Sequence, residues 1–269
     1  MAPPAGPGAV PGTDPELDVR TEEGVLRLTM NRPDRLNAMT GSMSDALAVQ
    51  LEGAAGRDDV RVVLLTGAGG AFSAGADVAG TDAHERFDVR ALDRANRLVR
   101  AIVTLDRPVV AAVRGVAAGV GCSMAVACDL VVAAESATFL LAFARIGLMP
   151  DGGATATVAA SVGRSRAMRM ALLAEPLPAR AAYDAGLVSH VVPDAEHEAA
   201  VRELVVRLVA GPPLSYAASK KAVNAATLAQ LDRTLDRERT GQSTLLRTAD
   251  AAEGMRAFTQ KRAPRFTGA

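Results

Sequence analysis

The chain of 269 residues contains no tryptophan, two tyrosines, six phenylalanines and only two cysteines. Because hydrophobic residues still make up 49% of the sequence, its core must be built from alanine, valine, leucine and methionine. Cys122 and Cys128 are not spaced as a CxxC pair and have no histidine near them in the sequence. This pattern argues against a zinc site and a disulfide framework, so we expect no metal and a reducing, cytoplasmic compartment.

Neither sign of charge is in excess, because 30 basic residues balance 30 acidic ones. A chain without net charge has no general attraction for nucleic acid or an anionic membrane, and local arginines or lysines would have to hold any anionic ligand. No apolar run of 18 residues is free of charged residues, so no membrane span is predicted. Residues 1–13 lack the basic and apolar regions of a signal peptide, and their proline, glycine and alanine predict a disordered tail.

Strand and helix patterns alternate through the first 195 residues, and only helical patterns follow. Apolar runs rich in β-branched residues predict strands at 25–30, 60–67, 107–115, 129–134 and 186–192. Helical spacing of apolar residues predicts helices at 40–54, 85–105, 162–174, 179–184, 196–210, 213–228, 230–247 and 248–258. This order predicts an α/β core over residues 14–195 and a C-terminal helical region over 196–269.

Two glycine-rich loops follow predicted strands, at 67–80 and 115–128, and open parallel sheets bind ligands at such strand ends. The first loop does not match a dinucleotide-binding fingerprint, because Phe72 holds the place of the third glycine and no helix follows directly. Glycines let a backbone approach a ligand closely, and N–H groups at the start of a helix have no intrahelical partner. Two such loops can each offer one N–H to a single oxygen, which is the design of an oxyanion hole.

The segment "LMPDGGAT" (148–155) places Asp151 in an otherwise apolar stretch, as the only carboxylate between Glu135 and Glu175. One interpretation is mechanical, because a Pro-Asp-Gly turn can use its aspartate to cap the following helix. The other is chemical, because an acid on an apolar wall can transfer protons. These eight residues by themselves favour the cap.

Four motifs occur in order along the chain: "NRPDRLNAM" (31–39), "AFSAGADV" (71–78), "RPVVAAVRGVAAGVGCSMAVACDLVVA" (107–133) and "RIGLMPDGGAT" (145–155). Together with the C-terminal "FTQKRAPRFTG", their order and spacing resemble those of the crotonase (enoyl-CoA hydratase/isomerase) superfamily. The resemblance implies an α/β spiral of ββα units with a C-terminal helical region that builds homotrimers, often paired into hexamers. It also implies an acyl-coenzyme A thioester as the substrate, with no cofactor besides the coenzyme A of that thioester.

The resemblance also implies site residues. Matching positions assign the two oxyanion-hole donors to the backbone N–H groups of Ala76 and Val120, where the family usually has glycine at the second position. Other matching positions imply contacts with coenzyme A, with Lys261 often reaching a neighbouring subunit's ligand; they are Arg35, Ala38, Ala74, Asp77 and Lys261. For Arg35 and Lys261, ordinary solvated charge is the alternative.

The sequence departs from the family's hydratases, which hold and activate water with two glutamates. Ser123 and Phe143 stand at those two positions, and neither can act as a base near neutral pH. In the isomerase branches an acid at the position of Asp151 moves a proton between two carbons of the acyl chain, which changes the balance in favour of a catalytic Asp151. We therefore favour isomerisation of a 3-enoyl thioester to a 2-enoyl thioester, with Asp151 also able to cap its helix.

Two other hypotheses stay open: a thioester hydrolase or dehalogenase-like enzyme that uses Asp151, and an acyl-CoA-binding protein without activity. Among the remaining polar residues, Ser123 is expected to pack and Asp77 to cap or brace a turn. Asp129, before a predicted strand, is expected to be structural. Solvated roles are expected for Glu135 and the three histidines, His84, His190 and His197.

Overall fold

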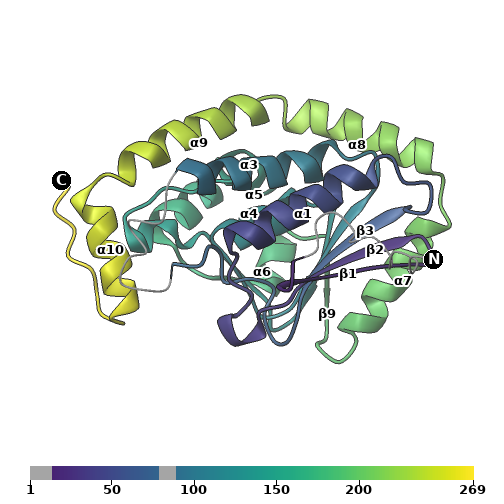
Figure 1. Cartoon of the computed structure of the whole chain (residues 1–269), viewed down its shortest axis with the longest axis horizontal. Helices are drawn as coiled ribbons and strands as arrows, with labels where there is room; N and C mark the ends of the chain where they lie inside the picture. The colour runs from purple at the N-terminus through teal and green to yellow at the C-terminus, as the bar shows by residue number, and fades with distance from the viewer. Residues whose placement is uncertain (1–13, 79–88) are drawn as a thin grey trace, which may run out of the picture.

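The structure is a computed structural model that describes residues 14–78 and 89–269. The predicted N-terminal tail and the beginning of the predicted helix at 85–105 lie outside these residues. Figure 1 shows a sheet on one side of the molecule, helices packed over it, and α10 (Ala249–Thr259) at the opposite end. The predicted mixture of a parallel-rich sheet and helices is confirmed.

The main sheet has six strands in the order β1-β2-β3-β4-β6-β9. Its strands are β1 (Leu17–Glu22), β2 (Val25–Met30), β3 (Val62–Gly67), β4 (Val109–Val113), β6 (Leu130–Ala134) and β9 (His190–Val192). Only β1 is antiparallel to its neighbour; the pairs from β2 to β9 are parallel. The five predicted strands are confirmed, β2 with the predicted bounds and the other four with shorter ones, and β1 was not predicted.

Both faces of this sheet are covered, which explains why β4 is apolar throughout and β3 is apolar over its first four residues. Side chains alternate along a strand, so Val63 and Leu65 of β3 join the larger core while Val62 and Leu64 join a second one. The larger core lies under α1 (Gly41–Ala54), α3 (Val89–Thr104) and α4 (Val120–Ala127). On the other face α7 (His197–Val209) adds Val201 and Val205 to the second core. The first helix after residue 195 therefore packs directly on the sheet.

The chain also forms a second sheet of three short strands, separate from the main sheet. It has the order β5-β7-β8, made of β5 (Val116–Ala118), β7 (Thr138–Leu140) and β8 (Leu177–Pro178). The change of direction after β4 occurs at Gly115, whose φ is +54° and where a Cβ atom would lie 2.0 Å from the carbonyl oxygen of Gly70. A side chain cannot fit there, so β5 lies directly against the first glycine-rich loop.

Six further helices complete the described part of the chain. They are η1 (Pro33–Arg35), η2 (Ala142–Ile146), α5 (Ala154–Leu173), α6 (Ala179–Asp184), α8 (Pro213–Thr227) and α9 (Leu231–Leu245). The chain bends within α5 at Gly163, so the predicted helix at 162–174 is the second part of a longer element. Thr40 caps α1 as predicted, with its hydroxyl accepting a hydrogen bond from the Met43 N–H.

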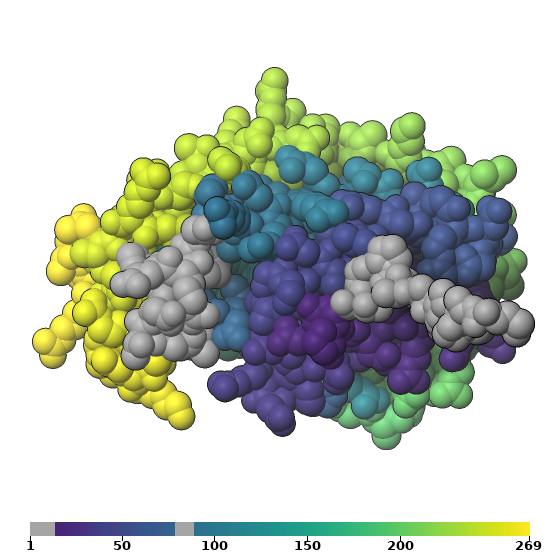
Figure 2. All heavy atoms as spheres, viewed as in Figure 1, coloured from purple at the N-terminus to yellow at the C-terminus, as the bar shows by residue number. Residues whose placement is uncertain are grey.

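The C-terminal helices cross the outside of the helical layer. In Figure 1, α8 and α9 run along the side of α3 and α5 away from the sheet, and Figure 2 shows their surface beside that of α1 and α3. Lys220 of α8 holds this arrangement: its ammonium group donates to the carbonyl oxygens of Ile102 and Arg107 and pairs with Asp129 at 2.8 Å. Asp129 also accepts from the Val109 N–H, which confirms its structural role.

No helix within residues 14–78 and 89–269 is long and apolar enough to cross a membrane. Over the same residues, no cluster of His, Cys, Asp and Glu side chains has the composition of a metal site. His197 corrects one expectation, because it is 3% exposed rather than solvated. Its Nδ1 accepts from Arg114 and its Nε2 lies 3.1 Å from the Val132 carbonyl oxygen, so it fastens the start of α7 to β6. His84 lies outside the described residues.

Candidate active site

The two glycine-rich loops meet at Gly75 and Gly119. The first loop runs beside β5, where the Ser73 N–H donates to the Val116 carbonyl oxygen and the Ala118 N–H donates to the Ser73 carbonyl oxygen. Gly75 has a φ of +95°, and a Cβ atom there would lie 2.8 Å from the Ala118 carbonyl oxygen. Gly119 has a φ of +52°, and its Cβ would lie 3.8 Å from the Gly75 Cα. Only glycine allows this approach without strain.

The residues that follow these two glycines are the predicted oxyanion-hole donors, Ala76 and Val120. Both line a cavity of about 450 Å³. Val120 is the first residue of α4, so its N–H has no partner within the helix. Among the described residues, neither the Ala76 N–H nor the Val120 N–H donates a hydrogen bond. Two backbone donors from different loops are thus left for a ligand atom in the cavity.

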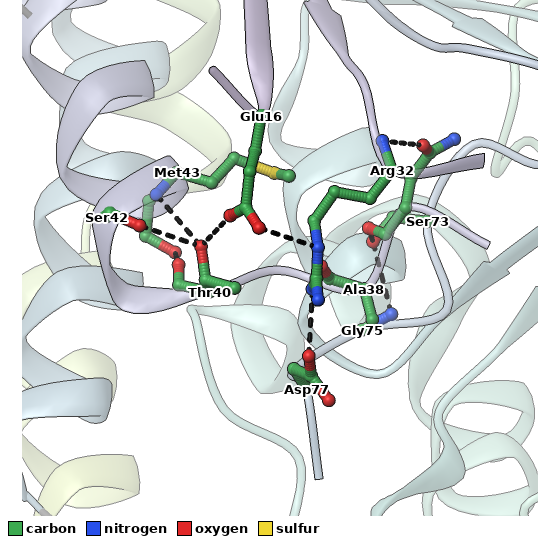
Figure 3. A network of polar contacts seen from close by, with 11 residues as sticks. Glu16, Arg32, Ala38, Thr40, Ser42, Met43, Ser73, Gly75 and Asp77 are labelled. Carbon is green, nitrogen blue, oxygen red and sulfur yellow. Dashed lines mark hydrogen bonds and ion pairs between the residues drawn. The ribbon is translucent and has the colours of Figure 1, made fainter. Parts of the chain in front are cut away.

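Arg32 ties the first loop to the end of β2, as Figure 3 shows. Its Nη1 donates to the Ala38 carbonyl oxygen at 2.7 Å and to Asp77 Oδ2 at 2.8 Å, and its Nε pairs with Glu16 at 2.9 Å. The Asp77 N–H in turn donates to the Met39 carbonyl oxygen at 3.0 Å. Asp77 therefore braces the turn that carries Ala76, as predicted, and it also lines the cavity.

Asp151 lies in the wall of the same cavity and is 5% exposed. Its Oδ2 accepts a hydrogen bond from Gln242 Nε2 at 2.9 Å, while its Oδ1 is buried without a hydrogen-bond partner among the described residues. Burial raises the pKa of Asp151 to about 7; the Gln242 hydrogen bond opposes this rise and the nearby Glu238 carboxylate adds to it. The carboxyl group is therefore able to bind and release a proton near neutral pH.

Asp151 does not cap the following helix, so that part of the expectation is wrong. The cap residue of α5 is Gly153, with a φ of +75°, and the Asp151 side chain makes no capping hydrogen bond. Glu238 of α9 satisfies this helix end instead: its carboxylate accepts from the Gly153 N–H at 2.7 Å and from the Thr155 N–H at 2.9 Å. The remaining role for the Asp151 carboxyl group is at the cavity.

The two positions where hydratases carry glutamate have different surroundings. The Ser123 hydroxyl is buried and donates to the Asp151 carbonyl oxygen at 2.8 Å, so it fixes the backbone of the acid as a packed residue. A Cβ atom at Gly152 would lie 3.2 Å from the Ser123 Cβ, which shows how tightly this turn packs on α4. Phe143 of η2 lines the cavity with an apolar ring. Neither residue brings a second acid to the cavity.

The predicted contacts with coenzyme A divide into two groups. Ala74 and Asp77 line the cavity. Ala38 is buried beside Arg32, and Arg35 and Lys261 are exposed away from the cavity lining of a single chain. Roles for the second group stay predictions.

The sequence reasoning missed two residues of α9, Glu238 and Gln242, although a signal for them exists. Leu231, Leu235, Glu238 and Gln242 recur at helical spacing, and all four are buried. Two polar residues therefore continue the apolar face of this helix. A buried polar side chain needs a partner, which points to a polar segment beneath α9.

The fold places the chain among the crotonase-fold proteins. The sequence model of the family described as "Enoyl-CoA hydratase/isomerase" matches residues 20–269, and the chain belongs to that family. It is 40% identical over 252 residues to the 1,2-epoxyphenylacetyl-CoA isomerase of Escherichia coli (strain K12), covering 92% of this chain and 96% of the relative. It is 37% identical over 254 residues to the 2,3-dehydroadipyl-CoA hydratase of the same strain, covering 94% and 99%.

Solved structures agree with this assignment. The crystal structure of an enoyl-CoA hydratase from Mycobacterium avium subsp. paratuberculosis K-10 is similar with a TM-score of 0.89 and 51% sequence identity. The match covers 94% of this chain and 98% of that one. Relatives are thus named both as isomerases and as hydratases, and the family includes enzymes that act on acyl-CoA substrates.

Proposed function

We propose that this enzyme is an acyl-CoA isomerase that shifts a double bond from the 3,4 to the 2,3 position, with Asp151 as the proton shuttle. The observation that carries the proposal is the Asp151 carboxyl group itself. It is buried in the cavity wall, has a pKa of about 7 and keeps one oxygen without a partner among the described residues. Among the described residues, the other acid in the cavity lining is Asp77, which is paired with Arg32.

The proposed reaction needs one base and one site for negative charge. The thioester oxygen binds between the N–H groups of Ala76 and Val120, and Asp151 removes a proton from C2. The electron pair of the broken C–H bond moves into an enolate, whose oxygen the two N–H groups stabilise. Return of the proton from Asp151 to C4 moves the double bond to C2–C3 and restores the carboxylate. The atoms balance without water or a cofactor.

The pKa of Asp151 suits both halves of this reaction. A carboxylate with its usual pKa near 4 would be a weak base toward a carbon acid, whereas a group near 7 takes the proton more readily and is still ionised in part at neutral pH. Desolvation supplies most of this shift. The apolar wall around the acid, which includes Phe143 and Leu148, therefore serves the chemistry as well as the packing.

The names of the relatives support chemistry on a coenzyme A thioester but do not separate its outcomes. A panel of 3-enoyl-, 2-enoyl- and aryl-CoA thioesters distinguishes the hypotheses. The proposal expects a 3-enoyl-CoA to give a conjugated 2-enoyl-CoA without release of free coenzyme A. Release of coenzyme A or halide would favour the hydrolase or dehalogenase hypothesis. Tight binding of coenzyme A thioesters without turnover of any of them would favour the binding protein.

Hydration of crotonyl-CoA is expected to be slow. Each missing acid–base group typically costs about 10²–10⁴-fold in rate, and Ser123 and Phe143 replace both glutamates of a hydratase. The loss of absorbance of the conjugated thioester measures this rate, and isomerisation of a 3-enoyl-CoA by the same preparation is the control. Rapid hydration that survives Asp151→Asn would show that the catalytic acids lie elsewhere.

We also propose that the chain assembles into a homotrimer or a dimer of trimers, with Lys261 completing a neighbouring site. The C-terminal helices leave large apolar side chains uncovered: Leu214 is 85% exposed and Val223 is 59% exposed. Such a surface is typical of a subunit interface. Light scattering at micromolar concentration should give three or six times the chain mass of 27.7 kDa. A strictly monomeric species would contradict both the assembly and the shared role of Lys261.

We also propose that the protein is located in the cytoplasm. This location is supported by the two cysteines, Cys122 and Cys128, which are both free, buried thiols in the structure.

A further inference from the structure

The side chain of Gln242 forms hydrogen bonds with the segment that carries Asp151. It is fully buried, its Oε1 accepts from the Met149 N–H at 3.1 Å, and its Nε2 donates to the Met149 carbonyl oxygen at 2.8 Å. The same Nε2 donates to Asp151 Oδ2 at 2.9 Å. Both ends of the amide are used, so the group has a single orientation. With Oδ2 bound in this way, Oδ1 is the oxygen of Asp151 left for a substrate proton.

Glu238 lies one turn earlier on the same face of α9 and holds the other side of this turn. It is 1% exposed, and its two oxygens accept from the N–H groups of Gly153 and Thr155. The pKa of Glu238 is itself raised, mainly by burial, while its hydrogen bonds to Thr155 and Gly153 oppose the rise. Gln242 therefore binds the beginning of the segment 149–155 and Glu238 binds its end. Both lie on α9, 93 residues from Met149 and 83 residues from Thr155, respectively.

We propose that α9 carries two positioning residues for the reaction, Gln242 and Glu238, which hold residues 149–155 from one helix face and leave Oδ1 of Asp151 as the oxygen that meets the substrate. The inference rests on the proposed role of Asp151 as the base. Gln242 donates to the carboxylate and so favours the ionised form of Asp151. Glu238 places a second negative charge nearby and so favours the protonated form. Together the two effects keep the pKa of Asp151 in a range in which the carboxyl group can both accept and return a proton.

Other charged groups around the cavity have partners of their own. Arg94 of α3 pairs with Asp45, Arg145 of η2 donates to the Ala174 carbonyl oxygen, and Asp77 pairs with Arg32. The uncharged Ser123 of α4 donates to the backbone oxygen of Asp151 and not to its carboxyl group. Within the described residues, α9 is therefore the element whose side chains act on the Asp151 carboxyl group.

The pH profile of kcat/KM tests this inference, because its acidic limb reports the base in the free enzyme. Gln242→Met removes the donor, so the midpoint should rise by roughly one pH unit and kcat should fall about tenfold or more, with a smaller change in KM. Glu238→Gln removes the second charge and keeps an oxygen acceptor for the helix end, so the midpoint should fall by roughly half a unit or more. Opposite shifts are the signature of the proposed roles.

Two control variants on the same helix match these changes. Gln230→Met alters an exposed glutamine at the start of α9, and Asp236→Asn removes an exposed negative charge two residues before Glu238. Both should leave the midpoint and kcat at the parent's values. A residue that only packs would lower kcat or the melting temperature but leave the midpoint unmoved, and that result in both Gln242→Met and Glu238→Gln would overturn the inference.

An infrared titration of the Asp151 carboxyl band gives a readout that does not depend on activity. The parent band should titrate near pH 7, and the two variants should move it in opposite directions. If Gln242→Met does not fold, Gln242→Glu keeps the acceptor for the Met149 N–H and places a second carboxyl group beside Asp151, which should raise the midpoint further. If Asp151→Asn retains activity, the proposed function fails; if that variant is inactive but neither midpoint moves, only this inference fails.

Discussion

Replacing Asp151 by asparagine is expected to lower the isomerisation of a 3-enoyl-CoA by at least about 10²-fold, because the proposed reaction then loses its proton carrier. Asparagine has nearly the same shape, and its side-chain oxygen can still accept from Gln242 Nε2. The fall should therefore appear in kcat rather than in the binding of coenzyme A thioesters. Steady-state kinetics with a 3-enoyl-CoA, together with titration of an unreactive acyl-CoA, separate the two quantities.

The pH dependence of stability gives a second expectation for the same variant. Burial raises the pKa of Asp151 in the folded chain to about 7, from a value of about 4 in the unfolded chain, so folding favours the protonated form. The stability linked to this group is fully present below about pH 4 and is lost as the pH rises through 7. Asp151→Asn removes that loss, so its melting temperature at pH 8 should be no lower than the parent's.

An exposed aspartate provides the control for both measurements. Asp106→Asn, just before β4, should leave isomerisation and the stability profile unchanged. In the parent, kcat/KM should rise with pH through a midpoint near 7, and the residual rate of Asp151→Asn should not follow that profile. An Asn variant that melts like the parent and keeps full activity on a 3-enoyl-CoA would show that Asp151 is not the base.

Local patterns in the sequence predicted those parts of the fold that are decided locally. The predicted strands at 60–67, 107–115 and 129–134 contain uninterrupted apolar stretches at 62–65, 108–113 and 130–134, and such stretches are typical of strands whose sheet is covered on both faces. Thr40 stands directly before an amphipathic segment and caps it. Ala76 and Val120 were predicted as donors from the glycine-rich loops at strand ends together with the resemblance to a family, and the structure places both in the lining of one cavity.

Contacts between distant segments could not be predicted in the same way. The strands β7 and β8 have three and two residues, too few for an alternating pattern to show. The capping of the start of α5 was predicted to come from the nearest acid in the sequence, Asp151. In the structure Glu238 caps it instead, and Glu238 lies 83 residues from Thr155 in the chain. Because capping is a matter of which oxygen lies near the free N–H groups, a tertiary contact can replace a local one. Because Glu238 binds the N–H groups at the start of α5, the Asp151 carboxyl group is not used for capping and lines the cavity.

The largest effect outside Asp151 is expected at Gly75, where the backbone that presents the Ala76 N–H depends on the absence of a side chain. In Gly75→Ala the new Cβ would lie 2.8 Å from the Ala118 carbonyl oxygen at a φ of +95°, so the loop must move away from β5. Loss of one donor to an oxyanion typically costs about 10²–10³-fold in kcat. Isomerisation should fall by that amount, while strain of about 1–3 kcal/mol should lower the melting temperature by only several degrees.

Gly70→Ala in the same loop is the matched control, because a Cβ atom at Gly70 would meet no atom within 4 Å. It should leave both activity and melting temperature near the parent's values. A bound cinnamoyl thioester reports the donor directly, since its absorbance moves to longer wavelength when hydrogen bonds polarise the carbonyl group. That shift should be smaller in Gly75→Ala than in the parent and unchanged in Gly70→Ala. If Gly75→Ala is folded and shows the parent's spectral shift and kcat, the Ala76 N–H does not hold the substrate oxygen, and the charge of the enolate must be stabilised elsewhere in the cavity.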